Sequence, residues 1–308
     1  MHTIKQSLLN GENIVLAGAH DALTARLAEE AGFDGIWGSG FEISASFGVP
    51  DANIITMTEQ LERCRQMADS VSLPVIADCD NGYGSLANAV RTIQQFERAN
   101  VAGVCLEDNV FPKRCSFYRG TVRALASLKE HANKIKDCIS ARQNNQFLVI
   151  ARTEALIAEE GLDAALLRAH AYADAGADAV LVHSRADQPH EVLAFASLWQ
   201  RPETPLVAVP TTYDQVPARV LHEAGFKIVI FANQGLRSAI RAIQENLRML
   251  RQAGHASVLR ERLVSIEEVA RLVRVGDLRE QGSAEALRPN VLKDEKAARS
   301  VFAQCIPI

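Results

Sequence analysis

The chain has 308 residues, of which 48% are hydrophobic and 23% are charged, a composition that is typical of a globular protein with a large core. Its formal net charge of -4 gives no general attraction for nucleic acid or for an anionic membrane, so local cations would have to hold an anionic ligand. The six cysteines form no Cys-x-x-Cys pair, which favours a reducing, cytoplasmic setting. We expect neither a signal peptide nor a membrane span, because the first 13 residues are polar and no apolar run is long enough.

Apolar strands alternate with amphipathic helices along the whole chain. We expect strands at residues 13–19, 35–40 (with the loop that follows), 74–80, 103–108, 147–155, 179–184, 205–210 and 228–233. We expect helices at residues 21–31, 56–71, 85–99, 128–142, 162–175, 190–199, a short segment ending at 224, and 236–252. Asp21 is placed to cap the first of these helices, and Gly32 to end it.

One phrase recurs where a helix meets the next strand: Ala31-Gly-Phe-Asp-Gly-Ile, Ala175-Gly-Ala-Asp-Ala-Val and Ala224-Gly-Phe-Lys-Ile-Val. Eight strands, each followed by a helix, predict an α/β fold of the (β/α)8 TIM-barrel type. The alternative is a doubly wound open sheet, but no Gly-x-Gly-x-x-Gly follows the first strand. We assign residues 1–254 to the barrel and 255–308 to a C-terminal extension, with a helix at 258–273 and a loose, charged end at 276–308.

Polar residues cluster where the predicted strands end, which is where a barrel of this type carries its active site. Asp78 and Asp80 close the third strand and, two residues apart, are expected to share one face. Glu107 and Asp108 close the fourth strand. Four carboxylates on adjacent strands, with no histidine among them, predict a hard-oxygen site for Mg²⁺.

The fifth and sixth strands end in cationic residues that are suited to an anionic group. Arg152 can bind a carboxylate or phosphonyl group through two hydrogen bonds, and His183 follows on the next strand. The competing interpretations are an ion pair between Arg152 and Glu154 at the barrel mouth, and a histidine that belongs to the wall. Trp37 is interpreted as a packing residue that also covers the ligand. These patterns together predict a small dianion, bound to Mg²⁺ on one side and to cations on the other.

Six segments carry a family resemblance. They are Trp37-Gly-Ser-Gly-Phe-Glu-Ile-Ser-Ala-Ser, Val49-Pro-Asp-Ala-Asn, Ala77-Asp-Cys-Asp-Asn-Gly-Tyr-Gly, Glu107-Asp-x-x-Phe-Pro-Lys, Ile150-Ala-Arg-Thr-Glu-Ala-Leu-Ile-Ala and Val182-His-Ser-Arg. In this order, over residues 13 to 274, the chain resembles the phosphoenolpyruvate mutase and phosphonopyruvate hydrolase family of the isocitrate lyase superfamily. The resemblance implies a barrel whose last helix is exchanged between subunits, a homodimer or homotetramer, Mg²⁺, and a small 2-oxo acid or phosphonate substrate.

The resemblance also implies roles for individual residues. Asp78, Asp80 and Glu107 would form the metal sphere, with Asp80 the most direct ligand, and Asp51 would lie near its water network. The backbone at Ser39 and Gly40 would hold the carboxylate and oxo groups of the ligand. Arg152 and His183, with Ser184 beside it, would face the phosphonyl group. The histidine favours a phosphonate substrate, because carbon–carbon lyases of the superfamily usually lack it.

The loop after the fourth strand departs from the family. Asn109 stands where the mutases have Lys, and Cys115 stands where the mutases have Asn and the hydrolase has Thr. The run Lys113-Arg-Cys resembles the lyases, whose cysteine is an acid/base, but Ser116-Phe replaces their Gly-His. With Lys113 and Arg114 beside it, the Cys115 thiol is a candidate proton donor or nucleophile with a lowered pKa. The competing interpretation is an inert loop cysteine.

We therefore expect a Mg²⁺-dependent enzyme that acts on the carbon–phosphorus bond of phosphonopyruvate through a pyruvate enolate. The favoured reaction interconverts phosphoenolpyruvate and phosphonopyruvate, and the first alternative hydrolyses phosphonopyruvate to pyruvate and phosphate. A second alternative is a carbon–carbon lyase or hydrolase of oxaloacetate or an alkylmalate, which would use Cys115. A barrel that has lost catalysis and serves as a binding protein is a further possibility, against which the retained acids argue. No nucleic acid or membrane partner is expected.

Overall fold

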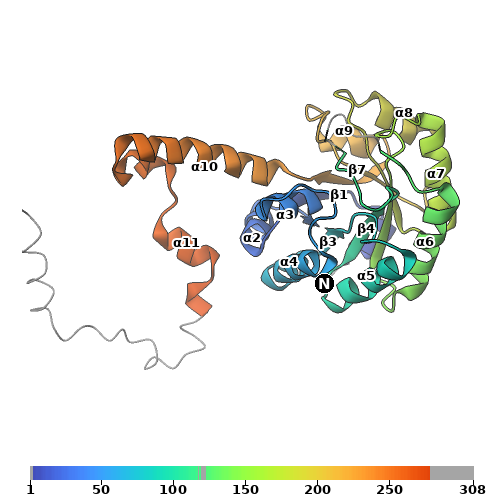
Figure 1. Cartoon of the computed structure of the whole chain (residues 1–308), viewed down its shortest axis with the longest axis horizontal. Coiled ribbons are helices and arrows are strands. Elements are labelled where there is room, and N and C mark those ends of the chain that lie inside the picture. Colours follow the sequence, from blue (N-terminus) through green and yellow to red (C-terminus); the bar gives the residue numbers. More distant parts are fainter. Residues whose placement is uncertain (1–2, 117, 119–122, 278–308) are drawn as a thin grey trace, which may run out of the picture. The chain divides into compact units, whose positions relative to one another are not determined.

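The computed structural model describes residues 3–116, 118 and 123–277. Eight parallel strands close into a barrel in chain order, and β1 pairs with both β2 and β8. The strands are β1 (Ile14–Ala19), β2 (Gly35–Gly38), β3 (Val75–Asp78), β4 (Gly103–Glu107), β5 (Leu148–Thr153), β6 (Ala179–Val182), β7 (Leu206–Ala208) and β8 (Phe226–Phe231). The predicted (β/α)8 barrel is thus confirmed, and the open sheet is excluded (Figure 1).

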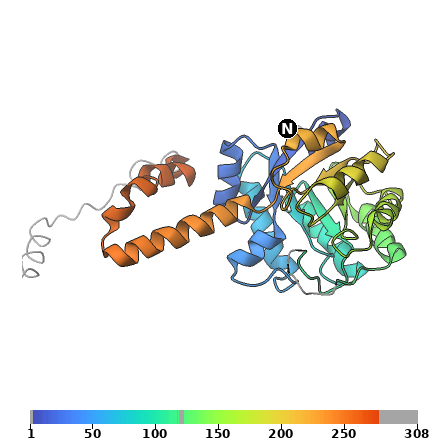
Figure 2. The ribbon, with the colours of Figure 1, turned by 90° about the horizontal axis from the view of Figure 1, so that it is seen from above.

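Helices surround this barrel, as Figure 2 shows from a second direction. They are α1 (Ile4–Leu9), α2 (Ala22–Glu30), α3 (Gly40–Ser46), α4 (Met57–Ser70), α5 (Leu86–Arg98), α6 (Leu128–Ala141), α7 (Leu162–Asp174), α8 (His190–Leu198) and α9 (Ala218–Glu223). The long helix α10 (Gln234–Ala253) follows β8 along the chain. The Asp21 side chain accepts a hydrogen bond from the Thr24 amide and so caps α2, as predicted. The short helices α1 and α3 were not predicted. Each is shorter than two turns of a helix, so its apolar periodicity is too brief to detect.

Two layers of apolar side chains hold the barrel together. The inner layer fills the barrel with alternate strand residues, among them Leu16, Ile76, Ile150 and Leu181, all at most 1% exposed. The outer layer lies between the sheet and the helices and contains side chains such as Phe96. Because successive strand residues face opposite layers, both faces of every strand are buried, and this explains the nearly continuous apolar runs in the sequence.

The chain divides into two compact units, Met1–Arg248 and Met249–Ile308. The proposed boundary after residue 254 stays a prediction. In the second unit the expected helix at 258–273 is two pieces, the 3₁₀ helix η1 (Ala256–Arg262) and α11 (Ile266–Leu272). Ser265 separates them, because its side chain accepts a hydrogen bond from the Glu268 amide and begins a new helix. Most of the predicted loose end lies outside the described residues. No helix in the described ranges is long and apolar enough to cross a membrane.

Candidate active site

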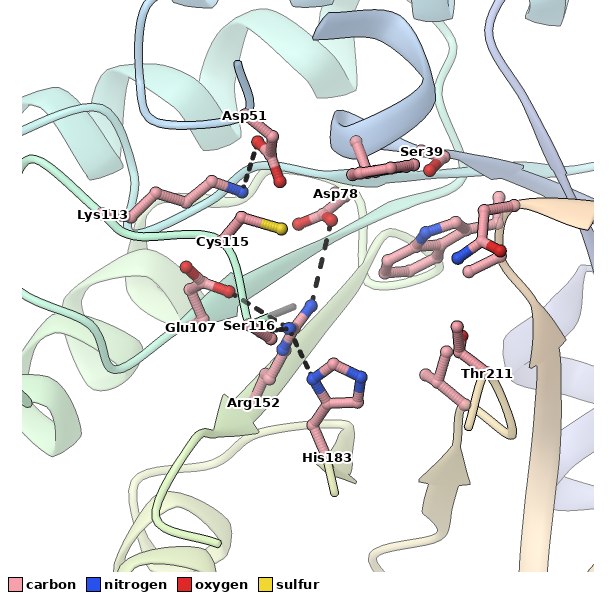
Figure 3. A pocket seen from close by; sticks show the side chains of 15 residues that line it. Ser39, Asp51, Asp78, Glu107, Lys113, Cys115, Ser116, Arg152, His183 and Thr211 are labelled. Carbon is pink, nitrogen blue, oxygen red and sulfur yellow. Dashed lines mark hydrogen bonds and ion pairs between the residues drawn. The ribbon is translucent and has the colours of Figure 1, made fainter. Parts of the chain in front are cut away.

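A cavity lies at the carboxyl ends of the barrel strands, where the sequence placed the site (Figure 3). Acidic side chains line one part of its wall, and basic side chains line another. Its lining residues are Trp37, Ser39, Phe41, Asp51, Asp78, Glu107, Lys113, Cys115, Ser116, Arg152, His183, Val209, Thr211, Ala232 and Asn233. The free space for the centres of water-sized molecules is only ≈ 40 Å³, enough for about three waters. Lys113, Cys115 and Ser116, all from the loop after β4, form part of the wall of this small cavity.

The carboxylates of strands β3 and β4 meet on one side of this cavity. Asp78 is the last residue of β3, and Glu107 is the last residue of β4. Asp80, expected within the strand, lies beyond its end with a φ of 51°. Its left-handed backbone turns the chain at this point, so strand alternation does not explain its direction. A Cβ atom on Gly40 would lie 3.4 Å from the Asp78 and Asp80 carboxylate oxygens, so a glycine here lets α3 approach both acids.

Burial raises the pKa of Asp80 and of Glu107 above the usual carboxylate range, although the Lys113 ammonium lowers both. Asp80 is 4% exposed and Glu107 is 3% exposed. Buried anions are costly unless cations compensate them. A further cation beside Asp80 and Glu107 would therefore lower the energetic cost of burying their negative charges.

Lys113 supplies one cation from the loop. Its ammonium lies 2.8 Å from Asp51 Oδ1 and also pairs with Asp80. Although burial lowers it, these carboxylates bring the pKa of Lys113 well above its usual value, so the side chain stays charged. Asn53 joins the same region, because its Oδ1 accepts the Lys113 amide at 2.6 Å and its Nδ2 donates to Asp80 Oδ2 at 2.8 Å. The sequence prediction did not single out Asn53, although it lies in the Val49-Pro-Asp-Ala-Asn segment.

Arg152 and His183 lie together, beside the acids and not across from them, because β5 pairs with β4 and Glu107 is the register partner of Arg152. Arg152 Nη2 is 2.8 Å from His183 Nδ1, and Arg152 Nε donates to Glu154 Oε1 at 2.6 Å. The terminal nitrogens of Arg152 also reach toward the acids, 3.5 Å from Glu107 Oε2 and 3.9 Å from Asp78 Oδ2. Burial and the Arg152 charge lower the pKa of His183, so its ring is neutral near neutral pH. The sequence left open whether Arg152 pairs with Glu154 or faces a ligand. In the structure Arg152 pairs with Glu154 and also lines the cavity.

The described residues of the loop between β4 and α6, 109–116, 118 and 123–126, lie over this site and are called the lid below. Its two ends are joined where Asn109 bridges to Leu125 and the Val110 amide donates to the Ala124 carbonyl oxygen. Cys115 is 5% exposed, lines the cavity and points its thiol toward Asp78 (Figure 3). Its role as an acid/base stays a prediction.

Five predicted ligand residues are not among those that line the cavity: Gly40, Asp80, Asp108, Asn109 and Ser184. Asp108 is fully buried and turned outward, because its carboxylate accepts the Tyr172 hydroxyl at 2.7 Å and the Glu154 amide at 2.8 Å. The expected set of four acids from strands three and four is therefore wrong at Asp108. Asn109 donates to Glu107 Oε1 at 2.9 Å and so acts behind that acid. Ser184 is likewise outside, since its hydroxyl donates to Glu191 and accepts the Ala186 amide.

The donor set suits a divalent cation that keeps part of its shell for water and ligand oxygens. Within the described ranges, no group of three or more His, Cys, Asp or Glu side chains is close enough to hold a metal ion by itself. Mg²⁺ is usually held by one or two carboxylates together with waters and substrate oxygens. Burial raises the pKa of both Asp80 and Glu107 in spite of the Lys113 ammonium nearby, so a further positive charge would stabilise their ionised forms, and the residues present fit such an ion.

Comparisons with known proteins agree with this geometry. The phosphonopyruvate hydrolase of Variovorax sp. is 42% identical over 270 residues, covering 87% of this chain and 93% of that protein. The crystal structure of phosphoenolpyruvate phosphomutase from Streptomyces platensis subsp. rosaceus has a TM-score of 0.86 and 44% identity, covering 89% of this chain and 97% of the other. A phosphonopyruvate hydrolase complex with oxalate and Mg²⁺ has a TM-score of 0.84 and 40% identity, covering 90% and 95%. Residues 4–251 match the family described as phosphoenolpyruvate phosphomutase, and the chain belongs to this family.

Proposed function

We propose that the protein is a Mg²⁺-dependent enzyme that acts on the carbon–phosphorus bond of phosphonopyruvate and interconverts it with phosphoenolpyruvate. The observation that carries this proposal is the division of one cavity into a carboxylate side, with Asp78 and Glu107, and a cationic side, with Arg152 and His183. A phosphonate bearing an oxo acid has matching ends, one that chelates a metal and one that binds cations.

Asp78, Asp80 and Glu107 would hold the metal, with Asp51 near its water shell. The ion would supply Lewis-acid stabilisation for the enolate oxygen. The Ser39 amide already donates to the Ala19 carbonyl oxygen, so of the proposed backbone pair we assign the Gly40 amide to the ligand. Trp37, at 2% exposure, forms a flat apolar wall beside it.

On the cationic side, Arg152 and His183 would bind the phosphonyl oxygens. Arg152 keeps its charge throughout the working pH range, and a neutral His183 adds a hydrogen bond without a second full charge. Their side chains would orient the phosphorus for departure from carbon and hold it beside the enolate. The chain's own part in catalysis is therefore to position both ends of the substrate and to exclude water with the lid.

The lid would decide the fate of the transferred group. A tightly closed lid favours its return to the enolate oxygen, which is the mutase reaction. A lid that admits water gives pyruvate and phosphate, and this hydrolase reaction is the second candidate, because relatives with either name are about equally identical to the chain. Carbon–carbon cleavage of a dicarboxylate is the third. The Cys115 thiol in the cavity favours it, and His183 argues against it.

One experiment separates these reactions. The protein is incubated with Mg²⁺ and phosphonopyruvate, with phosphoenolpyruvate or with oxaloacetate, and the products are followed by phosphorus NMR and a pyruvate assay. Phosphoenolpyruvate formed from phosphonopyruvate supports the mutase, and free phosphate supports the hydrolase. Cleavage of the dicarboxylate without turnover of either phosphorus compound would overturn the proposal.

We further propose a cytoplasmic homodimer or homotetramer in which α10 packs against another subunit. The supporting observation is a row of exposed apolar side chains on α10 at helical spacing, Ile240, Ile243 and Leu247, which are 42%, 56% and 58% exposed. Light scattering coupled to gel filtration would give the mass. A monomer for the unaltered chain, or an unchanged mass for Ile243→Glu, would refute this assembly.

A further inference from the structure

Glu154, which the sequence indicated only as an ion-pair partner of Arg152, also contacts His183 and the lid. It follows β5 directly and is 0% exposed. Its Oε1 accepts Arg152 Nε at 2.6 Å and lies 3.0 Å from His183 Nδ1. Its Oε2 accepts the Ser116 hydroxyl at 2.7 Å. One carboxylate thus contacts both predicted phosphonyl-binding residues and the lid.

Glu154 is an anion throughout the working pH range. Burial raises its pKa, but the Arg152 guanidinium beside it brings that pKa far below the usual carboxylate range. A charged hydrogen bond to Nε fixes the plane of the Arg152 guanidinium, so that its two terminal nitrogens face the cavity. The direction of Arg152 therefore depends on Glu154.

The backbone of Glu154 is fixed by a hydrogen bond to Asp108, on the side away from the cavity. Its amide donates to Asp108 Oδ1 at 2.8 Å, and Asp108 Oδ2 accepts the Tyr172 hydroxyl from α7. The Asp108 carbonyl oxygen accepts the Ala126 amide at the end of the lid, also at 2.8 Å. Asp108, absent from the cavity wall, thus links Glu154 to the point where the lid leaves the barrel.

The lid also contacts the Glu154 carboxylate directly, through Ser116. Ser116 Oγ donates to Glu154 and accepts Arg152 Nη2 at 3.0 Å, so it lies between the two charged groups. Arg123 Nη2 donates at 2.8 Å to the carbonyl oxygens of Cys115, Ser116 and Tyr118, which gives this part of the lid a defined shape. Ser116 is 4% exposed and completes the surroundings of Arg152.

We propose that Glu154 is a positioning residue for Arg152 and His183, and that the lid docks on it through Ser116. Arg152 Nη2 then has both of its protein partners, Ser116 and His183, only when the lid is closed, and Nη1 is the terminal nitrogen assigned to the anion. That the bound anion is a phosphonyl group rests on the proposed function, whereas the docking itself does not.

Amide hydrogen exchange on the ligand-free protein tests the docking. Ser116→Ala and Glu154→Gln should each speed exchange of a peptide covering residues 110–116 by about tenfold, as expected for the loss of about one hydrogen bond that holds a local opening shut. Ser116→Thr keeps the hydroxyl and should retain the protection. Glu159→Gln is the matched control, because Glu159 lies on the same turn but pairs with Arg185 at the surface. Unchanged exchange in Ser116→Ala, or in Glu154→Gln with a folded β5, would overturn the proposal.

Kinetics with Mg²⁺ and phosphonopyruvate test the positioning role. Glu154→Gln should lower kcat/KM about 100-fold and Ser116→Ala about tenfold. The double variant should resemble Glu154→Gln alone, because residues that act through one contact are not additive. A loss of about 1,000-fold in the double variant would mean independent roles and would contradict the proposal. If the unaltered protein turns over no phosphonopyruvate, the proposed function fails, and the exchange rates alone decide the docking.

Discussion

The wall of the cavity and its lid are built by different means. The wall residues Asp78, Glu107, Arg152 and His183 lie at or just beyond the ends of consecutive strands, where parallel ladders fix their positions, as in the pairing of Glu107 with Arg152. The lid residues are held by side-chain contacts, such as Ser116 to Glu154. Each such contact replaces hydrogen bonds to water and contributes only about 1 to 3 kcal/mol, the upper part of the range applying to bonds with a charged group such as Glu154. A wall of this kind is preorganised, and a lid of this kind can open.

The difference separates two aspects of function. The wall sets which class of ligand binds, because its charges are fixed before the ligand arrives. In the proposed reaction the lid would set which product forms, because it would control the access of water and it brings Cys115 to the cavity. The wall also carries the motifs that agree with the family, whereas the lid carries the departures at Asn109 and Cys115. Changes in the wall should therefore abolish activity, and changes in the lid should alter its rate or products.

The largest effect is expected in the carboxylate wall. Asp80→Ala should lower kcat/KM by at least about 1,000-fold for any of the three candidate reactions, since metal-ion catalysis supplies several kcal/mol. Steady-state kinetics with saturating Mg²⁺ measure it, with the exposed Asp137→Ala as the control. Substantial activity in Asp80→Ala would remove Asp80 from the metal site.

The same wall should report metal binding without catalysis. Mg²⁺ at about 100 times its Kd should stabilise the folded protein by about 2.7 kcal/mol, because it binds the native state alone. Thermal unfolding with and without Mg²⁺ measures the gain. Asp80→Ala should lose most of it, and an equal gain in both proteins would place the ion elsewhere.

On the cationic wall, Arg152→Lys should lower kcat/KM about 100-fold although the charge is kept. Lysine has a point charge, and it cannot donate to Glu154, His183 and a phosphonyl group with the fixed geometry of a guanidinium. Kinetics with phosphonopyruvate test this expectation. A loss of kcat/KM below about threefold would show that a positive charge at this position is enough for activity. The view that the wall acts through fixed geometry would then be contradicted.

The buried side chain of His131 should make the free energy of unfolding depend on pH. His131, on α6, is 0% exposed, and burial lowers its pKa to about 3. In the unfolded chain it titrates near its usual value of about 6.5, so below that pH the unfolded state binds the extra proton. Its contribution to stability is therefore present above pH of about 6.5 and falls by about 1.4 kcal/mol at pH 5.5. Urea unfolding at both pH values, compared with His131→Gln, measures it, and an equal pH dependence in the two proteins would contradict the assignment.

The smallest effect is expected in the lid. Cys115→Ser should lower the rate of a mutase or hydrolase by less than about fivefold, because neither reaction assigns a proton transfer to the thiol. For a carbon–carbon lyase that uses Cys115 as an acid/base, the loss should exceed about 100-fold. Rates measured with phosphonopyruvate and with oxaloacetate distinguish these two cases. Cys138→Ser, in the apolar layer between the sheet and the helices, is the control for the loss of a buried thiol.

The sequence alone determined the eight strands, the long helices and the wall of the site. Strand ends and apolar periodicity are local properties, and in a parallel barrel every strand end faces the same rim, so Asp78, Glu107, Arg152 and His183 had to lie around one mouth. Prediction failed where direction depends on a local turn or on a distant partner. Asp80 leaves the strand through a left-handed turn, and Asp108 turns outward to Tyr172.

Only the tertiary structure decided how the lid meets the wall. Ser116 and Glu154 are 38 residues apart, and Asn53 and Lys113 are 60 apart. No periodicity relates such positions, because they meet only after the barrel has closed and the lid has folded over it. The residues proposed to bind the ligand were thus readable from strand ends, whereas the contacts of Ser116 with Glu154 and of Asn53 with Lys113 form only across the finished fold.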